Sequence, residues 1–145
     1  MNKIYSPVTG ILHPITEAPD EVFSQKMMGD GYMIYPTEGL AVSPVDGKVT
    51  LVFPTKHAIG LKADDGTECM LHIGVDTVKL EGKGFEALTV EGQEVKKGDK
   101  LIMFDIDYIK THAASEACLV VFTGGQQIYL QKKGAVEALD EIGYY

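Results

Sequence analysis

Two histidines stand in settings where an imidazole could do chemistry. His72 lies within the apolar run Cys69–Thr77, which predicts a β-strand that ends near Gly74. Because side chains alternate between the two faces of a strand, His72 should share a face with Met70 and oppose Leu71. A neutral imidazole nitrogen is a good nucleophile near pH 7, since its reference pKa is about 6.5. The pattern therefore predicts a nucleophilic histidine on an apolar floor, with one edge open to solvent.

His57 precedes the neighbouring predicted strand, and a hairpin should bring it to His72. The sequence Asp64-Asp65-Gly66 favours a tight turn between the two strands. Folding about that turn pairs residues whose numbers sum to about 130, so residue 57 should lie roughly opposite 72 or 74. A shift of register by one residue would send the two side chains to opposite faces. We expect both imidazoles at one end of the ladder.

The ordinary alternative is that each histidine is structural. A lone histidine in a strand is more often a satisfied structural residue than a nucleophile, and only the pairing of two histidines changes that expectation. His13 and His112 have no such pairing and are interpreted as structural or exposed. Cys69 lies three positions from His72, on the opposite face of the strand. This spacing argues against a Cys–His dyad and favours a buried thiol.

Two aspartates could form an acidic rim around the histidine pair. Asp30 lies in the sequence Met28–Gly31, and Asp76 follows His72 closely. An isolated Gly-Asp-Gly predicts only a turn, so Asp30 gains weight only if it borders the histidines. Such a rim would repel an incoming anion, but it would help docking if a donor protein brings arginines.

The elements that must position these residues are short strands, bounded by Gly, Pro, Asp or Lys. The candidate strands are Gly10–Ile15, Tyr32–Tyr35, Lys48–Phe53, His57–Lys62, Thr67–Ile73, Lys100–Ile106, Cys118–Phe122 and Gln127–Leu130. This pattern predicts an all-β fold, a sandwich or barrel, in a single domain over residues 1–145. Short helical turns are expected only near Asp20–Lys26 and Asp107–Ala114.

The sequence repeats internally. Ser6-Pro7-Val8-Thr9-Gly10 recurs as Ser43-Pro44-Val45-Asp46-Gly47, and each copy should be a tight turn that begins a strand. The phrase Gly92–Leu101, with Val95, Asp99 and Leu101, has a weaker echo in Val136, Asp140 and Ile142. The later copy lacks the glycine before its aspartate, and Ala135–Ile142 could instead form a short terminal helix.

Composition excludes several classes of function. The 145 residues carry a net charge of −8 and no dense Lys/Arg run, which argues against nucleic-acid binding. No secretory signal and no apolar segment of membrane-spanning length is visible. Cys69 and Cys118 are too few for a disulfide framework and lack metal-ligand spacing, which favours a reducing, cytoplasmic setting.

Several phrases together resemble the glucose-type enzyme IIA of the bacterial phosphoenolpyruvate-dependent sugar phosphotransferase system. The resemblance covers nearly the whole chain, and the phrase His72–Val78 is highly specific. The other matching phrases are Pro19–Phe23, Met28–Gly31, Ser43–Gly47, Phe53–Ala58, Gly82–Phe85 and Gly92–Leu101.

The resemblance implies a barrel-like β-sandwich, a duplicated hybrid motif, that acts as a cytoplasmic phosphocarrier. By that resemblance, His72 accepts a phosphoryl group through Nε2 from the phosphohistidine of HPr. It then passes the group to a cysteine of a IIB domain, which phosphorylates the sugar carried by a IIC membrane domain. The carrier would thus be a stoichiometric phosphotransferase component that needs no metal or other cofactor and meets the membrane only through the permease.

The resemblance also implies roles for other residues. His57 would stabilise the phosphoryl group, Thr55 would orient His57, and the Gly74 carbonyl would fix the His72 tautomer. Asp30 and Asp76 would form ion pairs with arginines of the donor. The remaining partner-binding residues are expected to be Phe53, Ile59 and Met70.

Two other classes stay open at this point. One is a zinc hydrolase built on His57 and His72 with Asp30 or Asp76, although no His-x-His pair occurs. The other is a lipoyl- or biotin-type carrier, of which the Gly92–Leu101 phrase is typical, although no suitable lysine at a hairpin tip is apparent.

The sequence departs from the family pattern at two places. Relatives often have an aromatic residue at the position of Ile59, and the segment Thr111–Ala117 lacks an expected proline-rich stretch. Met1 favours a free protein over a domain of a fused permease.

Overall fold

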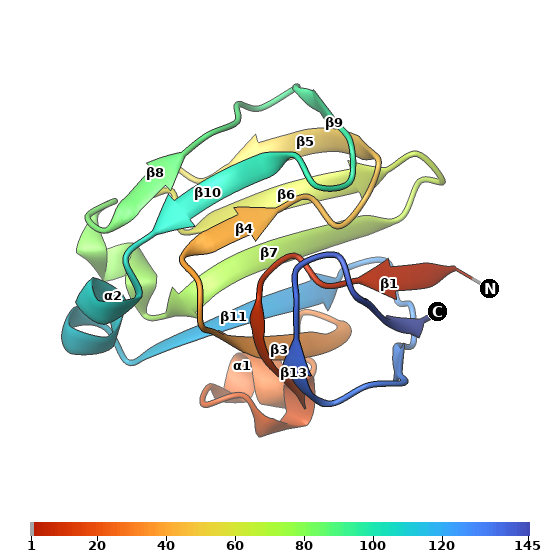
Figure 1. Ribbon diagram of the computed structural model, residues 1–145, viewed down its shortest axis with the longest axis horizontal. Helices are drawn as coiled ribbons and strands as arrows, with labels where there is room; N and C mark the ends of the chain where they lie inside the picture. Colours follow the sequence, from red (N-terminus) through yellow and green to blue (C-terminus); the bar gives the residue numbers. More distant parts are fainter. Residues whose placement is uncertain (1) are drawn as a thin grey trace.

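The computed structural model describes residues 2–145, which form antiparallel β-sheets with a few short helices (Figure 1). The largest sheet has eight strands in the order β13-β2-β3-β11-β7-β6-β5-β9. In that order they span Gly134–Val136, Gly10–Pro14, Asp30–Pro36, Ser115–Phe122, Glu68–Val75, Ala58–Ala63, Gly47–Val52 and Glu94–Val95. The predicted all-β class is confirmed.

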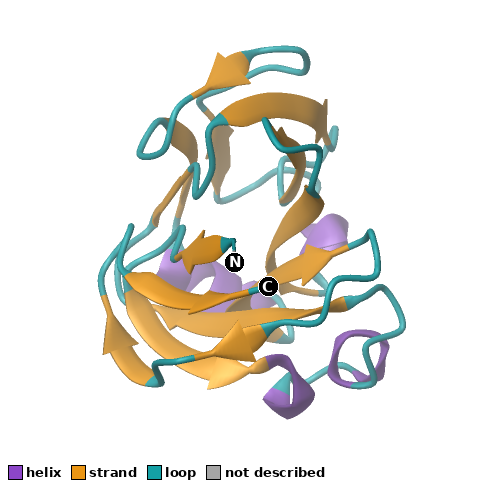
Figure 2. Cartoon of the chain, turned by 90° about the vertical axis from the view of Figure 1, so that its right-hand side faces the viewer, coloured by secondary structure: helices purple, strands orange, loops and turns teal. Residues whose placement is uncertain are grey.

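Two three-stranded sheets complete the sandwich. One consists of β1 (Lys3–Tyr5), β14 (Glu141–Tyr144) and β12 (Tyr129–Leu130), and the other of β4 (Leu40–Val42), β10 (Lys100–Phe104) and β8 (Phe85–Ala87). Figure 2 shows the two ends of the chain side by side, where β1 pairs with β14. The main core joins all three sheets, as the buried residues Ile142, Ile102 and Leu71 illustrate. Closely packed apolar side chains therefore fill the space between the layers.

A second, smaller core covers the outer face of the large sheet. Here η1 (Ile15–Glu17) and α1 (Glu21–Ser24) pack on Met33 and Leu119 through side chains that include Ile15 and Phe23. The carboxylate of Asp20 accepts the amide of Val22 at 2.8 Å, which caps the first turn of α1. The sheet is consequently apolar on both faces in this region, and α1 lies beside the row of residues that includes His72.

The predicted hairpin between β6 and β7 has the expected register. Ala58 pairs with His72 and Ile59 with Leu71, so the numbers of paired residues sum to 130. Leu71 and Ile73 face the main core, whereas Met70 packs on the outer face, as the alternation predicts. The predicted strands are present, although the short strands β1, β4, β8, β9, β13 and β14 were not predicted.

Both internal repeats are visible in the hydrogen bonds. The hydroxyls of Ser6 and Ser43 each donate to the carbonyl two residues later at 2.7 Å. The side chains of Asp99 and Asp140 each accept the amide three residues earlier at 2.9 Å. The alternative of a terminal helix over Ala135–Ile142 is wrong, because β13 and β14 flank a turn there.

The other helices are η2 (Thr77–Leu80) and α2 (Ile106–His112). They account, with α1 and η1, for the helical turns of the described part of the chain. No helix between residues 2 and 145 is both long enough and apolar enough to cross a membrane.

Candidate functional site

The imidazoles of His57 and His72 meet at one end of the β6–β7 hairpin. Their ring centroids are 4.8 Å apart and their planes are inclined at 79°. His57 lies just before β6, and its carbonyl accepts the amide of Ile73 at 2.7 Å. Residue 57 is thus opposite residue 73, between the two positions that the sequence suggested, and the predicted meeting of the two imidazoles is confirmed.

His72 is held with a defined tautomer. Its Nδ1 donates to the carbonyl oxygen of Gly74 at 2.8 Å, so in the neutral ring Nε2 carries the lone pair. The Phe23 ring lies 5.2 Å from the imidazole, centroid to centroid. Burial lowers the pKa of His72, and the bond to Gly74 and the charge of Asp20 partly offset this effect. The ring is therefore neutral and nucleophilic near pH 7.

His57 is more deeply placed, with 3% of its surface exposed. Its Nδ1 lies 2.7 Å from the hydroxyl of Thr55, and the ring of Phe53 packs against it at 5.4 Å between centroids. Burial and then the neighbouring His72 lower the pKa of His57 to about 4. Two uncharged imidazoles therefore share the site at neutral pH.

Local turns explain why these partners come together. Thr55 lies in a turn in which the Lys56 amide donates to the carbonyl of Phe53 at 2.8 Å. Gly74 has a φ of +78°, a conformation that favours glycine. A Cβ at this position would lie 2.3 Å from the methyl carbon of Thr77. The carbonyl that holds His72 thus depends on a glycine for both its conformation and its space.

Two aspartates lie close to the histidine pair: Asp76 along the chain and Asp20 in space. Asp76 follows the end of β7, is exposed, and makes no side-chain capping bond to η2. Asp20 caps α1, and its charge acts on His72. The role of Asp20 at the site was not predicted, although the aspartate before Val22 is a recognisable helix-capping signal.

The structure does not bring Asp30 to the histidine pair, contrary to the sequence expectation. The row of residues through His72 crosses β11 at Leu119 and β3 at Met33. Asp30 lies three positions from Met33 at the start of β3, where it pairs with Phe122. Asp30 lies two positions from Tyr32 and therefore shares the face of β3 that Tyr32 turns to the main core. Met33 lies on the opposite, outer face, where it packs with α1.

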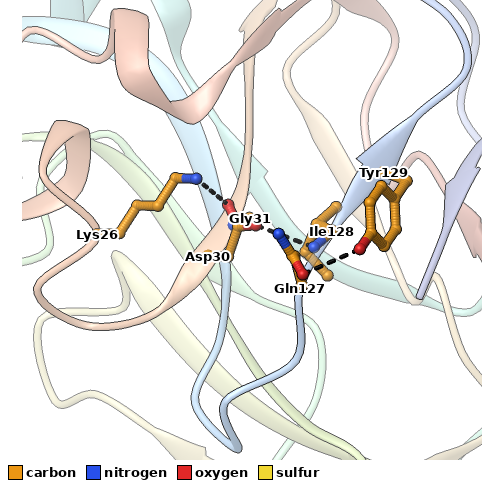
Figure 3. Close-up of polar contacts among 6 residues, drawn as sticks. All are labelled: Lys26, Asp30, Gly31, Gln127, Ile128 and Tyr129. Atoms are coloured by element: carbon orange, nitrogen blue, oxygen red, sulfur yellow. Dashed lines mark hydrogen bonds and ion pairs between the residues drawn. The ribbon is translucent and has the colours of Figure 1, made fainter.

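The carboxylate of Asp30 is engaged elsewhere. Its Oδ1 accepts the amide of Gly31 at 2.8 Å and lies 3.5 Å from the Nζ of Lys26, and its Oδ2 accepts the amide of Ile128 at 2.9 Å (Figure 3). Figure 3 also shows the neighbouring bond from the Tyr129 hydroxyl to the side-chain oxygen of Gln127. Asp30 therefore ties the start of β3 to the segment that leads into β12.

The predicted partner-binding apolar residues divide into two groups. Phe53 and Met70 are half-buried near the pair. Ile59 is fully buried in the main core, contrary to the expectation that it forms part of a docking floor, because its side chain points inward between the sheets. Exposed apolar side chains instead come from the segments that border the pair, namely Val22 of α1, Leu51 of β5 and Val78 of η2.

Other reactive groups do not join this site. Within residues 2–145, no group of three or more His, Cys, Asp and Glu side chains is arranged to hold a metal ion. Cys69 and Cys118 are buried free thiols, and burial raises the pKa of Cys69 to about 12. Phe23 and Thr77 complete the surroundings of His72 and Gly74, and neither was assigned a role from the sequence.

Comparisons with known proteins agree on one family. Residues 2–128 match the family model described as phosphoenolpyruvate-dependent sugar phosphotransferase system, EIIA 1. The glucose-specific EIIA components of the phosphotransferase system from two strains of Staphylococcus epidermidis are 54% identical over 125 residues, which is 86% of this chain and 75% of those proteins. The solved structure of glucose permease IIA from Mycoplasma capricolum superposes with a TM-score of 0.92 at 39% identity, covering 97% of this chain and 93% of that one.

Proposed function

The chain belongs to the EIIA 1 family of the phosphoenolpyruvate-dependent sugar phosphotransferase system, and on this basis we propose that it is a cytoplasmic carrier that holds a phosphoryl group on His72. The donor is the phosphohistidine of HPr, and the acceptor is a cysteine of a IIB domain. Residues 1–145 act as one IIA unit in this scheme. The observation that carries the proposal is the bond from His72 Nδ1 to the Gly74 carbonyl, which leaves the Nε2 lone pair for attack.

The first transfer is an in-line displacement at phosphorus. The lone pair of His72 Nε2 forms the new nitrogen–phosphorus bond while the bond to the donor imidazole breaks and its electron pair returns to that ring. Such a transfer asks the protein for positioning and for stabilisation of the charge on the phosphoryl oxygens. The bond to Gly74 supplies the positioning, because it fixes both the ring plane and the tautomer.

His57 supplies the stabilisation. If the Thr55 hydroxyl donates to Nδ1 of the neutral ring, Nε2 of His57 carries the proton and donates to a phosphoryl oxygen on the neighbouring imidazole. The low pKa of His57 supports this role, since a neutral ring keeps one nitrogen as acceptor for Thr55. The thiolate of the IIB cysteine then attacks the phosphorus, and His72 leaves with its electron pair.

The surroundings of the pair suit a protein partner. Half-buried Phe53 and Met70 and exposed Val22, Leu51 and Val78 offer an apolar docking surface. Asp76 and Asp20 give this surface an acidic edge to which arginines of a donor can be attracted. The net charge of −8 favours the approach of a partner with positive charge.

The proposal is tested by reconstitution. The protein is incubated with phosphoenolpyruvate, enzyme I and HPr, and its intact mass is measured. We expect a gain of one phosphoryl group that is labile in acid and stable in base, and no gain in His72→Ala. His112→Ala is the matched control, because His112 is exposed on α2, donates to the carbonyl of Tyr108 and stacks on the ring of the same residue. Labelling that survives in His72→Ala would overturn the proposal.

A further inference from the structure

We propose that Thr77 is a positioning residue for His72: its hydroxyl group holds the turn that presents the Gly74 carbonyl to the imidazole. This inference rests on the proposed function only in treating His72 as the reacting group. Thr77 does not contact the reacting nitrogen, and it acts through the backbone of residues 73 and 74.

The hydroxyl of Thr77 closes the turn after β7. Ile73 is the position at which β7 pairs with the residue preceding β6, its amide donating to the carbonyl of His57 at 2.7 Å. The carbonyl of the same Ile73 accepts the hydroxyl of Thr77 at 2.6 Å. The peptide that follows Ile73 therefore has a fixed orientation, and this peptide leads directly into Gly74.

The turn contains two residues in the left-handed region and needs such support. Gly74 has a φ of +78° and Asp76 a φ of +60°. A left-handed conformation costs most residues with a side chain roughly 1–2 kcal/mol, and aspartate adopts it more readily than most, so neighbouring contacts help to hold Asp76 in it. Thr77 is fully buried and follows directly, and its hydrogen bond spans both of these residues.

The methyl group of Thr77 packs closely against Gly74. A Cβ on Gly74 would lie 2.3 Å from this methyl carbon, 3.0 Å from the carbonyl oxygen of Ser115 and 3.4 Å from a methyl carbon of Ile109. Gly74, which belongs to β7, is thus enclosed by η2, β11 and α2, with the methyl carbon of Thr77 as the nearest of these contacts. Its carbonyl has little freedom to turn away from the Nδ1 of His72, which it accepts at 2.8 Å.

Thr77 differs from another threonine that makes the same local bond elsewhere in the chain. Thr111 makes the same local bond, its hydroxyl donating to the carbonyl of Asp107, four residues earlier, at 2.9 Å. Thr111 is exposed on α2, and no contact links it to Gly74. The two threonines therefore form a matched pair, in which the chemistry is equal and the connection to His72 differs.

The test compares Thr77→Val, Thr77→Ser and Thr111→Val in the full chain. Valine keeps the branched shape and removes the hydroxyl, whereas serine keeps the hydroxyl and removes the methyl group. The main measurement is the tautomer of His72 from ¹⁵N chemical shifts of the unphosphorylated protein. We expect Nδ1–H in the wild type, Thr77→Ser and Thr111→Val, and a mixture with Nε2–H in Thr77→Val.

The second measurement is the rate of phosphoryl acceptance from HPr. Thr77→Val should be slower by between about 10-fold and about 100-fold, the scale expected when a reacting group is misplaced. Thr77→Ser should keep most of the wild-type rate. The tautomer measurement needs no phosphoryl transfer, so failure of the proposed function would leave it interpretable.

Each outcome decides the inference. An unchanged His72 tautomer in Thr77→Val, or an equal change in Thr77→Ser, would overturn the assignment to the hydroxyl. If Thr77→Val does not fold, Thr77→Ala replaces it, because this smaller variant also removes the hydroxyl and carries the same expectation. A change in Thr111→Val as large as that in Thr77→Val would show a general effect on stability and would also overturn the inference.

Discussion

The imidazoles of His57 and His72 lie edge to face, and each is held at Nδ1 by a different kind of partner. A hydroxyl faces Nδ1 of His57, and a backbone carbonyl faces Nδ1 of His72. The carbonyl can only accept, so His72 must present an unprotonated Nε2 when neutral. The hydroxyl can donate, so His57 is free to present a protonated Nε2. The two rings are therefore suited to different tasks, one as nucleophile and one as donor.

Loss of the donor should separate the two transfer steps. His57→Ala keeps the nucleophile, so we expect it still to accept a phosphoryl group from HPr. Onward transfer to the IIB domain should fall by about 100-fold or more, the usual cost of removing a donor that stabilises developing charge. Rapid-quench measurement of both steps checks this expectation, with Thr55→Val as a milder variant that should disturb only the orientation of His57. Equal loss in both steps would contradict the division of tasks.

The charge of Asp20 should be measurable in the titration of His72. Because the Asp20 carboxylate raises the pKa of His72, Asp20→Asn should lower it further, while asparagine still caps α1. NMR titration of the imidazole checks the direction. Asp30→Asn is the control, since Asp30 bonds to Lys26, Gly31 and Ile128 and should leave this pKa unchanged. A larger effect from Asp30 would show that the two aspartates have been assigned the wrong way round.

The hairpin shows how much of this site could be predicted from the sequence. The turn at Asp64–Gly66 fixed the register, and the alternation of Met70 and Leu71 fixed the face, so the meeting of His57 and His72 followed from local rules. These rules depend on neighbours along one ladder. They did not depend on how distant segments pack.

The prediction for Asp30 was wrong because its surroundings depend on packing between segments that are distant in the sequence. The run Tyr32–Tyr35 is apolar on both faces because the main core lies on one side and α1 on the other, so its sequence did not show which face Asp30 shares. Ile59 is an exception, because the register of the hairpin pairs it with core-facing Leu71 and so already indicated an inward side chain. The cap at Asp20 predicts where α1 begins but not that α1 packs beside His72.

Stability should depend on pH through His57. Its pKa is about 4 in the folded protein and near 6.5 when unfolded, so the unfolded chain binds a proton in that interval and the folded chain does not. The contribution of His57 to stability is therefore complete above pH 6.5, falls as the pH drops toward 4, and changes no further below 4. The total change is about 3 kcal/mol.

The measurement is the free energy of unfolding in urea across this range. Carboxylates also titrate in its lower part, so the comparison is with His57→Gln, which lacks the titrating ring but keeps a polar side chain. We expect a shallower dependence on pH in the variant, by the amount assigned to His57. Parallel curves for the two proteins would show that the imidazole is not kept neutral by the fold.

A side chain at residue 74 should be more costly than at a comparable glycine on the surface. Gly74 and Gly66 have φ values of +78° and +93°, so alanine at either position pays for a left-handed conformation, about 1–2 kcal/mol. At Gly66 an added Cβ meets nothing within 4 Å, whereas at Gly74 it would lie 2.3 Å from the Thr77 methyl carbon and 3.0 Å from the Ser115 carbonyl oxygen. Crowding of this kind adds about 1–3 kcal/mol, so Gly74→Ala should be the less stable variant by that margin in urea unfolding.

The same crowding would move the Gly74 carbonyl, which accepts the hydrogen bond from His72. Gly74→Ala should therefore also slow the acceptance of a phosphoryl group from HPr, and Gly66→Ala should not. Equal stability of the two variants would mean that the backbone at residue 74 can yield freely, and its carbonyl could then not hold the imidazole in one tautomer.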